Sequence, residues 1–287
     1  MSIVVTGATG HLGHLVVEEL LDRGVPADHL LATGRRVERL EDLAARGVRT
    51  AVVDHDDVTT LDAALQPGDT VLLVSGSVPG ARVDQHRAVI GAATRAQVGA
   101  LVYTSATRAD DTPLVLAPDH AETEAALRAS GLPVVVLRNN WYTENYAQDL
   151  QRARETGVLA AGAGDGRVAS ATRRDYAAAT AAVLADPTEH VGRTYELGGD
   201  VAWTYDELAA AMGEVLGREV AYQRPSPEEQ TAALQEAGLD EGTAGFVVAL
   251  DGSIAAGALD VTTGDLSRLA GRPSTPLVEG LRPLAAA

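Results

Sequence analysis

The chain opens with a short apolar run that breaks into glycines three residues apart. Residues 2–6 read Ser-Ile-Val-Val-Thr, and glycine stands at positions 7, 10 and 13. Apolar side chains then recur at helical spacing until Gly24. This pattern predicts a strand, a tight turn and a helix that ends near Gly24.

Glycines between a strand and a helix are typical of a site for a dinucleotide. Glycine accepts positive φ and lets a phosphate approach the backbone, and the start of the helix attracts the anion. The strand before and the helix after are the context that this motif requires. The predicted cofactor residues of this segment are Gly7, Ala8, Thr9, Gly10, His11, Leu12 and Gly13.

Further apolar runs alternate with helical patterns along the first half of the chain. They predict strands at 30–33, 48–53, 70–74, 100–104 and 134–137. Strands that alternate with helices predict an α/β fold, here a Rossmann-type doubly wound parallel sheet.

The alternation loosens after about residue 146, and shorter elements follow. We therefore predict an NAD(P)-binding domain over residues 1–150, to which parts of 165–200 return, and a smaller α/β C-terminal region over residues 151–287. Capping boxes predict helices after Thr204 and Ser226, and an apolar helix around Phe246 is expected to roof the substrate site.

The residues after the second predicted strand indicate which cofactor is bound. Gly34-Arg35-Arg36 stands where NADH-binding proteins place a carboxylate. A guanidinium pairs with the 2′-phosphate of NADPH, whereas a carboxylate binds the ribose hydroxyls of NADH. Arg35 therefore favours NADPH; the alternative is that both arginines are solvated at a turn.

Polar and small residues end the next strands, where the cofactor of such a fold lies. Asp54 is expected near the adenine. The other expected contacts are Ser75, Gly76, Ser77, Gln85, Thr104 and Ser105.

Composition narrows the classes of function. The 287 residues include no cysteine, so disulfides and thiolate sites are excluded. The 40 acidic and 23 basic side chains give a net charge of −17, which disfavours binding to nucleic acid. No apolar run reaches the roughly 18 residues of a membrane span. We expect a cytoplasmic protein that binds neither membranes nor metals, with Asp54 to Asp57 forming a solvated loop and His11 and His14 being ordinary helix residues.

Several longer motifs resemble those of a known family. They are the opening Val-Thr-Gly-Ala-Thr-Gly-His-Leu-Gly, the strand end Tyr103-Thr104-Ser105, the helix around Asp119-His120, and the run Leu137 to Tyr146. Over nearly its full length the chain is similar to the NmrA-like atypical short-chain dehydrogenases/reductases, and most similar to their NADPH:quinone oxidoreductase 2 type.

The resemblance also shows a departure from the wider superfamily. That superfamily uses a Tyr-x-x-x-Lys pair as proton donor and ribose ligand. Aligned on Ser130-Gly131-Leu132, the tyrosine position holds Leu116 and the lysine position holds His120. Reduction of a carbonyl to an alcohol needs a positioned acid, whereas hydride addition to a quinone gives a stable hydroquinone anion.

Candidate catalytic groups follow from this comparison. His120 is expected to hold the ribose or to donate a proton, the alternative being a helix residue satisfied by its neighbours; Tyr142 or Tyr146 could be the donor instead. Asn139 and Asn140 are expected at the nicotinamide or at a purely structural turn. Trp141 is also expected to bind the cofactor, and an aromatic substrate could stack on Trp141, Tyr142 or Tyr205.

The predicted function is reduction of a quinone or related conjugated carbonyl by direct hydride transfer from NADPH without flavin. Two alternatives remain open: a redox sensor that binds NADP(H) without turnover, and a biosynthetic enone, imine or carbonyl reductase. Apolar helix faces are compatible with a homodimer.

Overall fold

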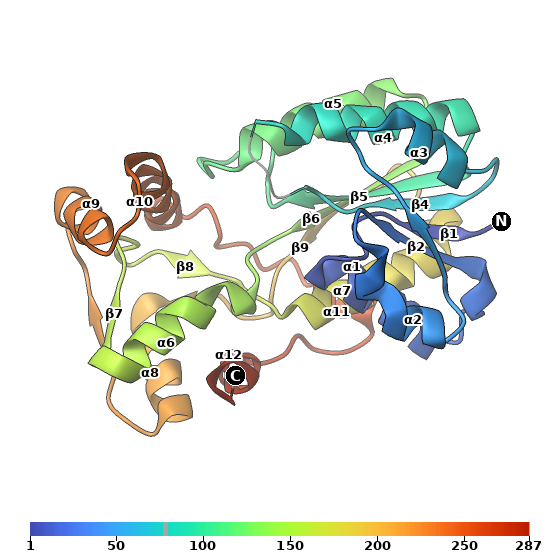
Figure 1. Cartoon of the computed structure of the whole chain (residues 1–287). Coiled ribbons are helices and arrows are strands. Elements are labelled where there is room, and N and C mark those ends of the chain that lie inside the picture. The colour runs from blue at the N-terminus through green and yellow to red at the C-terminus, as the bar shows by residue number, and fades with distance from the viewer. Residues whose placement is uncertain (77–79, 287) are drawn as a thin grey trace.

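The computed structural model describes residues 1–76 and 80–286, and its main element is a parallel sheet of seven strands (Figure 1). The strand order is β3-β2-β1-β4-β5-β6-β9. The strands are β1 Ile3–Val5, β2 Leu30–Gly34, β3 Arg49–Val52, β4 Thr70–Leu73, β5 Ala100–Ala106, β6 Val134–Asn139 and β9 Thr194–Leu197. The predicted Rossmann-type doubly wound sheet is confirmed.

Helices cover both faces of this sheet (Figure 1). One face carries α1 His11–Asp22, α2 Glu41–Ala45, α7 Arg173–Ala185 and α11 Asp265–Ala270; the other carries α3 Val58–Ala64, α4 Arg82–Ala96 and α5 Ala117–Ala129. Successive residues of a strand point to opposite faces, so Val5 packs in the first core and Val4 in the second. Burial on both sides explains why the central strands β1, β4 and β5 are mainly apolar, whereas the edge strand β3 is largely exposed.

The remaining elements build a third core beside the sheet. They are α6 Ala147–Thr156, β7 Val158–Ala160, β8 Arg167–Val168, β10 Trp203–Thr204, α8 Tyr205–Leu216, β11 Ala221–Gln223, α9 Pro227–Glu236, α10 Glu241–Ala255 and α12 Leu277–Ala286. Trp203, Met212 and Ile254 are buried there. The described residues also contain four 3-10 turns, at Ala27–His29, Val37–Leu40, Thr143–Tyr146 and Pro187–Glu189.

Capping boxes mark the starts of three helices, and two of these starts were predicted from the sequence. Capping boxes at Thr204 and Ser226 begin α8 and α9, and a further box at Thr172 begins α7. In the described part of the chain, no helix combines the length and the apolar character needed to cross a membrane.

Two strands extend beyond the prediction. β5 reaches Ala106 and β6 reaches Asn139, because Ser105 pairs with Arg138 and Ala106 with Asn139 in the ladder. Polar side chains therefore occupy buried strand positions at the carboxyl edge of the sheet, where they need polar partners.

Candidate active site

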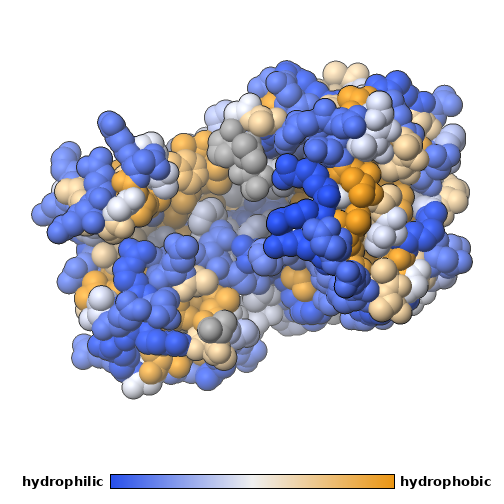
Figure 2. All heavy atoms as spheres, viewed as in Figure 1, coloured by the Kyte–Doolittle hydropathy of each residue, from blue (hydrophilic) through white to orange (hydrophobic). Residues whose placement is uncertain are grey.

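A cleft of about 940 Å³ lies at the carboxyl ends of the strands, where the sheet faces the region that carries α10. The surface is hollowed between these two parts of the molecule (Figure 2). The strand order reverses between β1 and β4, and ligands of open α/β sheets bind at that point. Residues from both strand ends, among them Gly7 and Ser75, line the cleft.

The glycine turn forms one end of the cleft. Gly7 has φ +65°, and a Cβ on Gly13 would lie 2.6 Å from the Gly7 carbonyl oxygen. No side chain caps the start of α1 at Gly10, and its first turn holds no acidic residue. A helix start of this kind attracts an anion.

The turn residues Gly7, Thr9, Gly10, His11, Leu12 and Gly13 all line the cleft, whereas Ala8 does not. Ala8 is fully buried, and its N–H donates to the Thr33 carbonyl at 2.8 Å. The Ala8 methyl group packs in the core, and the predicted cofactor contact of this residue stays a prediction.

Three arginines gather at the end of β2. The cleft is lined by the predicted Arg35 and also by Arg36 and Arg39. Arg39 lies in the 3-10 turn after β2, and no sequence motif singled it out. Asp54 lines the same part of the cleft. Guanidinium groups in this position suit a phosphate.

The acidic run after β3 is held by hydrogen bonds. Asp57 caps α3 by accepting from the Thr59 N–H, and Asp56 accepts from the Gln85 amide at 3.0 and 3.1 Å. Gln85 lines the cleft, so this pair connects the loop after β3 with α4.

The ends of β4 and β5 are tied together at the cleft floor. The Ser75 N–H donates to Thr104 Oγ1 at 2.9 Å, and the Gly76 N–H donates to Nε2 of the buried His86 at 3.0 Å. Ser75, Gly76, Thr104 and Ser105 line the cleft as predicted. The predicted contact Ser77 lies outside the described residues.

His120 lies in the cleft wall with both ring nitrogens engaged. Arg82 Nη1 lies 3.2 Å from Nε2, and the Tyr103 hydroxyl lies 2.8 Å from Nδ1. A guanidinium only donates, so Nε2 accepts and Nδ1 carries the proton. Burial and the Arg82 charge lower the pKa of His120 to about 4. This arrangement disfavours His120 as a proton donor at neutral pH.

Tyr142 also lines the cleft, and its hydroxyl, unlike the His120 ring, has a proton that no neighbour in the described residues accepts. Asn139 Nδ2 donates to the Tyr142 hydroxyl oxygen at 3.2 Å, which leaves the phenolic proton for another acceptor. Burial raises the pKa of Tyr142, so the group stays protonated. The ring packs edge-on against Tyr176 and under the Arg173 guanidinium.

The neighbours of Tyr142 divide into two kinds. Asn140 bonds to backbone groups, donating to the Leu259 carbonyl at 3.1 Å and accepting from the Trp141 N–H at 2.8 Å. These bonds fix the side chain, which also lines the cleft, and its contact with the nicotinamide end stays a prediction. Asn139 Oδ1 and Trp141 Nε1 are buried without a partner among the described residues. Such atoms in a cleft wall suit a polar ligand.

The other aromatic candidates lie elsewhere. Tyr146 and Tyr205 are buried in the third core, where their hydroxyls are 3.4 Å apart, and neither lines the cleft. The expectations that Tyr146 donates a proton and that Tyr205 stacks on a substrate were wrong, because both rings pack against Trp203. Phe246 of α10 lines the cleft as predicted.

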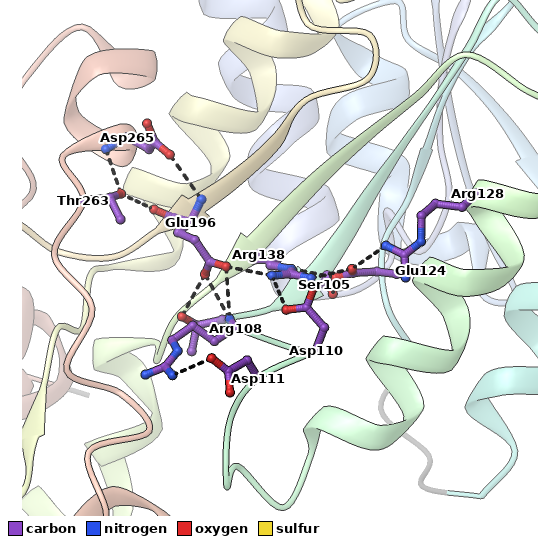
Figure 3. Close-up of polar contacts among 11 residues, drawn as sticks. Ser105, Arg108, Asp110, Asp111, Glu124, Arg128, Arg138, Glu196, Thr263 and Asp265 are labelled. Atoms are coloured by element: carbon purple, nitrogen blue, oxygen red, sulfur yellow. Dashed lines mark hydrogen bonds and ion pairs between the residues drawn. The ribbon is translucent and has the colours of Figure 1, made fainter.

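A charged network lies beneath Ser105 at the carboxyl edge of β6 (Figure 3). The buried Arg138 donates to both oxygens of the fully buried Glu124, at 2.9 and 2.7 Å, and to Glu196 at 3.0 Å. Its Nη1 also lies 2.8 Å from Asp110. These bonds raise the pKa of Arg138 and lower that of Asp110.

This network fixes the orientation of Ser105. The Ser105 hydroxyl donates to Glu124 Oε1 at 2.7 Å. Because the proton points to Glu124, the serine offers only its lone pairs to the cleft. Arg138 thereby joins β6, β9 and α5 around a hydrogen-bond acceptor in the cleft floor.

One cluster away from the cleft has the composition of a metal site. His14, Glu18 and Asp42 each place a ligand atom within 4.8 Å of the others, although we expected His14 to lack further ligands. His14 and Asp42 are already paired at 2.9 Å, and Asp42 is exposed. Exposed pairs of this kind form without an ion, so the cluster carries no metal assignment.

Comparison with known proteins agrees with this geometry. The sequence model of the NmrA-like family matches residues 1–244. Quinone oxidoreductase 2 of Escherichia coli is 44% identical over 279 residues, which cover 97% of each protein. The structure of an NADPH-dependent quinone oxidoreductase from Escherichia coli, complexed with NADPH, superposes with a TM-score of 0.94 at 44% identity and covers 98% of this chain and 99% of the other.

A second solved structure shows the same architecture. Triphenylmethane reductase of Citrobacter sp., complexed with NADP(H), has a TM-score of 0.92 at 36% identity and covers 99% of this chain and all of the other. The similarity that the sequence motifs indicated therefore covers nearly the whole structure. The chain belongs to the NmrA-like family.

Proposed function

We propose that the protein is an NADPH-dependent oxidoreductase that reduces a quinone or related conjugated carbonyl by direct hydride transfer, without flavin. One observation carries the proposal: a single cleft joins the glycine turn and Arg35 to apolar side chains at Leu114, Leu116 and Phe246. The relative named quinone oxidoreductase 2, with 44% identity over 97% of the chain, supports the same activity.

The cleft residues fit NADPH from end to end. The uncapped start of α1 suits the pyrophosphate, and Arg35, Arg36 and Arg39 suit the 2′-phosphate. Asn139 Oδ1 and Trp141 Nε1, which lack partners within residues 1–76 and 80–286, suit polar groups of the nicotinamide end or of the acceptor. When bound, NADPH supplies the hydride, and the protein supplies position and electrostatics.

Leu116 explains why a quinone fits better than a simple ketone. It lines the cleft at the position where the wider superfamily has its acidic tyrosine. Hydride addition to a quinone yields an aromatic hydroquinone anion, which a weak acid or water then protonates. We assign this weak acid to Tyr142, whose proton is free to face the acceptor.

The test is anaerobic consumption of NADPH, with NADH as control, by flavin-free protein given benzoquinones and naphthoquinones. Turnover that is much faster with NADPH than with NADH would support the proposal. Tight NADPH binding without consumption of any acceptor would refute it and favour the sensor, or a biosynthetic reductase with another substrate. Cytoplasmic location, the homodimer and the division near residue 150 stay predictions.

Arg35→Ala is expected to reduce the preference for NADPH over NADH by about 10- to 100-fold. This range corresponds to the loss of one charged hydrogen bond, which is worth about 1.5–3 kcal/mol. Arg46→Ala is the matched control, because Arg46 is an exposed arginine paired with Asp22 and does not line the cleft. The ratio of kcat/KM for the two cofactors measures the effect, and an unchanged ratio in Arg35→Ala would refute the assignment.

Tyr142→Phe is expected to lower kcat for quinones by about tenfold, below the usual range of general acid catalysis because a quinone needs little acid assistance. The phenylalanine ring keeps its packing on Tyr176. Tyr195→Phe, in which the hydroxyl lost is bonded to His190, is the control for removal of a tyrosine hydroxyl. The affinity for NADP⁺ should not change. An undiminished kcat would show that water alone is the donor.

A further inference from the structure

Arg82 is a cleft residue that neither the motifs nor the family resemblance singled out. It begins α4, lines the cleft and is only 6% exposed. A guanidinium keeps its charge at any physiological pH, and burying a charge is costly unless it is paired. The contacts of Arg82 therefore indicate what it binds.

The described residues compensate this charge only weakly. Nη1 donates to His120 Nε2 at 3.2 Å, and Nε is buried with no hydrogen-bond partner in the described part of the chain. The carboxylate of Asp119 lies 3.9 Å from Nε and is one-third exposed. A guanidinium has five N–H donors. A buried guanidinium in a cleft wall, with N–H groups that have no acceptor among the described residues, is suited to bind an anionic oxygen.

The histidines near Arg82 do not neutralise it. The His120 Nε2 accepts a hydrogen bond from Arg82, and its Nδ1–H donates one to the Tyr103 hydroxyl oxygen, so the ring is neutral. His86 accepts from the Gly76 N–H and lies against Thr123 Oγ1, so it is neutral as well. Glu124 is fully buried nearby, but both of its oxygens bind Arg138. His120 thus orients the guanidinium and leaves the charge available.

We propose that Arg82 binds the acceptor oxygen that becomes negatively charged during reduction, and that His120 is the positioning residue that holds it. The inference rests on the proposed function. The start of α1 and the arginines after β2 suit the anionic groups of NADPH, whereas Arg82 lies at the start of α4 and contacts His120 of α5.

The step balances without a further reagent. A C–H bond of the dihydronicotinamide breaks, its hydrogen and two electrons form a new bond to the quinone, and the quinone is reduced to a hydroquinone monoanion. The negative charge resides on oxygen, where Arg82 stabilises it by charge-assisted hydrogen bonds. One proton, from Tyr142 or water, then completes the hydroquinone.

The test measures binding without turnover. Protein saturated with NADP⁺ cannot deliver a hydride, so the affinity for 2-hydroxy-1,4-naphthoquinone, which is ionised at neutral pH, is compared with that for the neutral 2-methoxy analogue. The wild-type protein should prefer the anion by about tenfold, equivalent to roughly 1.4 kcal/mol. Arg82→Met should abolish the preference, and Arg82→Lys should keep part of it because the charge remains.

His120→Asn is the matched test of positioning. The anion preference should fall two- to threefold while the charge of Arg82 is retained. Thermal unfolding and titration with NADP⁺ establish that each variant is folded and binds cofactor, and Arg82→Lys keeps the test decisive if Arg82→Met is unstable.

Three results would overturn the inference. They are equal binding of both naphthoquinones by the wild-type protein, an undiminished anion preference in Arg82→Met, and a loss of NADP⁺ affinity in Arg82→Met with the preference intact. The last result would assign Arg82 to the cofactor. None of them depends on NADPH consumption, so the proposed function can fail or stand separately.

Discussion

Arg138→Met is expected to lower the free energy of unfolding by about 3–5 kcal/mol, the usual cost of leaving a buried charge without its partner. Glu124 is fully buried and receives two hydrogen bonds from Arg138 at 2.9 and 2.7 Å. Methionine fills much of the same space but cannot donate a proton. Glu196 and Asp110 lose the same partner.

Arg128→Met provides a close control for this prediction. Arg128 also binds Glu124, at 3.3 Å, but its side chain is 60% exposed. Exposed pairs contribute about 0–1 kcal/mol, so the control should change stability little. The two variants remove the same type of side chain from the same carboxylate and differ in burial.

Chemical denaturation at neutral pH of the wild-type protein, Arg138→Met, Arg128→Met, Glu124→Met and the double variant measures the difference. The variant Glu124→Met/Arg138→Met should be more stable than the sum of the two single changes predicts, because it leaves no unpaired charge between these two positions. Equal stability of Arg138→Met and Arg128→Met would contradict the interpretation that the buried ion pair between Arg138 and Glu124 in Figure 3 stabilises the fold.

The sequence allowed the sheet and the phosphate end of the cleft to be predicted, because both depend on local patterns. Apolar runs of four to six residues and the glycines that follow them are contiguous in the chain. Gly7 takes positive φ where the turn was expected, and Gly24 follows α1 with φ +84°. These features need no knowledge of distant residues.

The electrostatic part of the site could not be predicted in this way. Arg138 meets Glu124 from α5 and Glu196 from β9, which are 14 and 58 residues away. Arg82 meets His120 at a separation of 38 residues. Hydrophobic periodicity predicts that these helices and strands exist. Their charged side chains meet only through tertiary packing: β6 pairs with β9 and lies against α5, and α4 packs on α5.

His120 illustrates the limit of a family alignment. Its position, equivalent to the superfamily lysine, suggested a ribose ligand or an acid. Burial and the neighbouring Arg82 lower its pKa to about 4, and both of its nitrogens have partners. The alignment located the residue in the cleft wall, whereas its protonation depends on a neighbour from another helix.

Gly13→Val is expected to weaken NADP⁺ binding by on the order of 100-fold, or about 2.7 kcal/mol. A Cβ at position 13 would lie 2.6 Å from the Gly7 carbonyl oxygen and 2.9 Å from Ala8 Cα. Both are backbone atoms, so the turn itself must move. The start of α1 would then no longer face the pyrophosphate.

Gly252→Val is the matched control, because Gly252 lies within α10 and, apart from the backbone of that helix, no described atom lies within 4 Å of an added Cβ. It introduces the same β-branched residue into a helix, away from the turn. Calorimetric titration with NADP⁺ measures affinity, and thermal unfolding shows whether each variant is folded. If folded Gly13→Val bound NADP⁺ as tightly as Gly252→Val, close packing of α1 on the turn could not be what places the helix start at the cofactor.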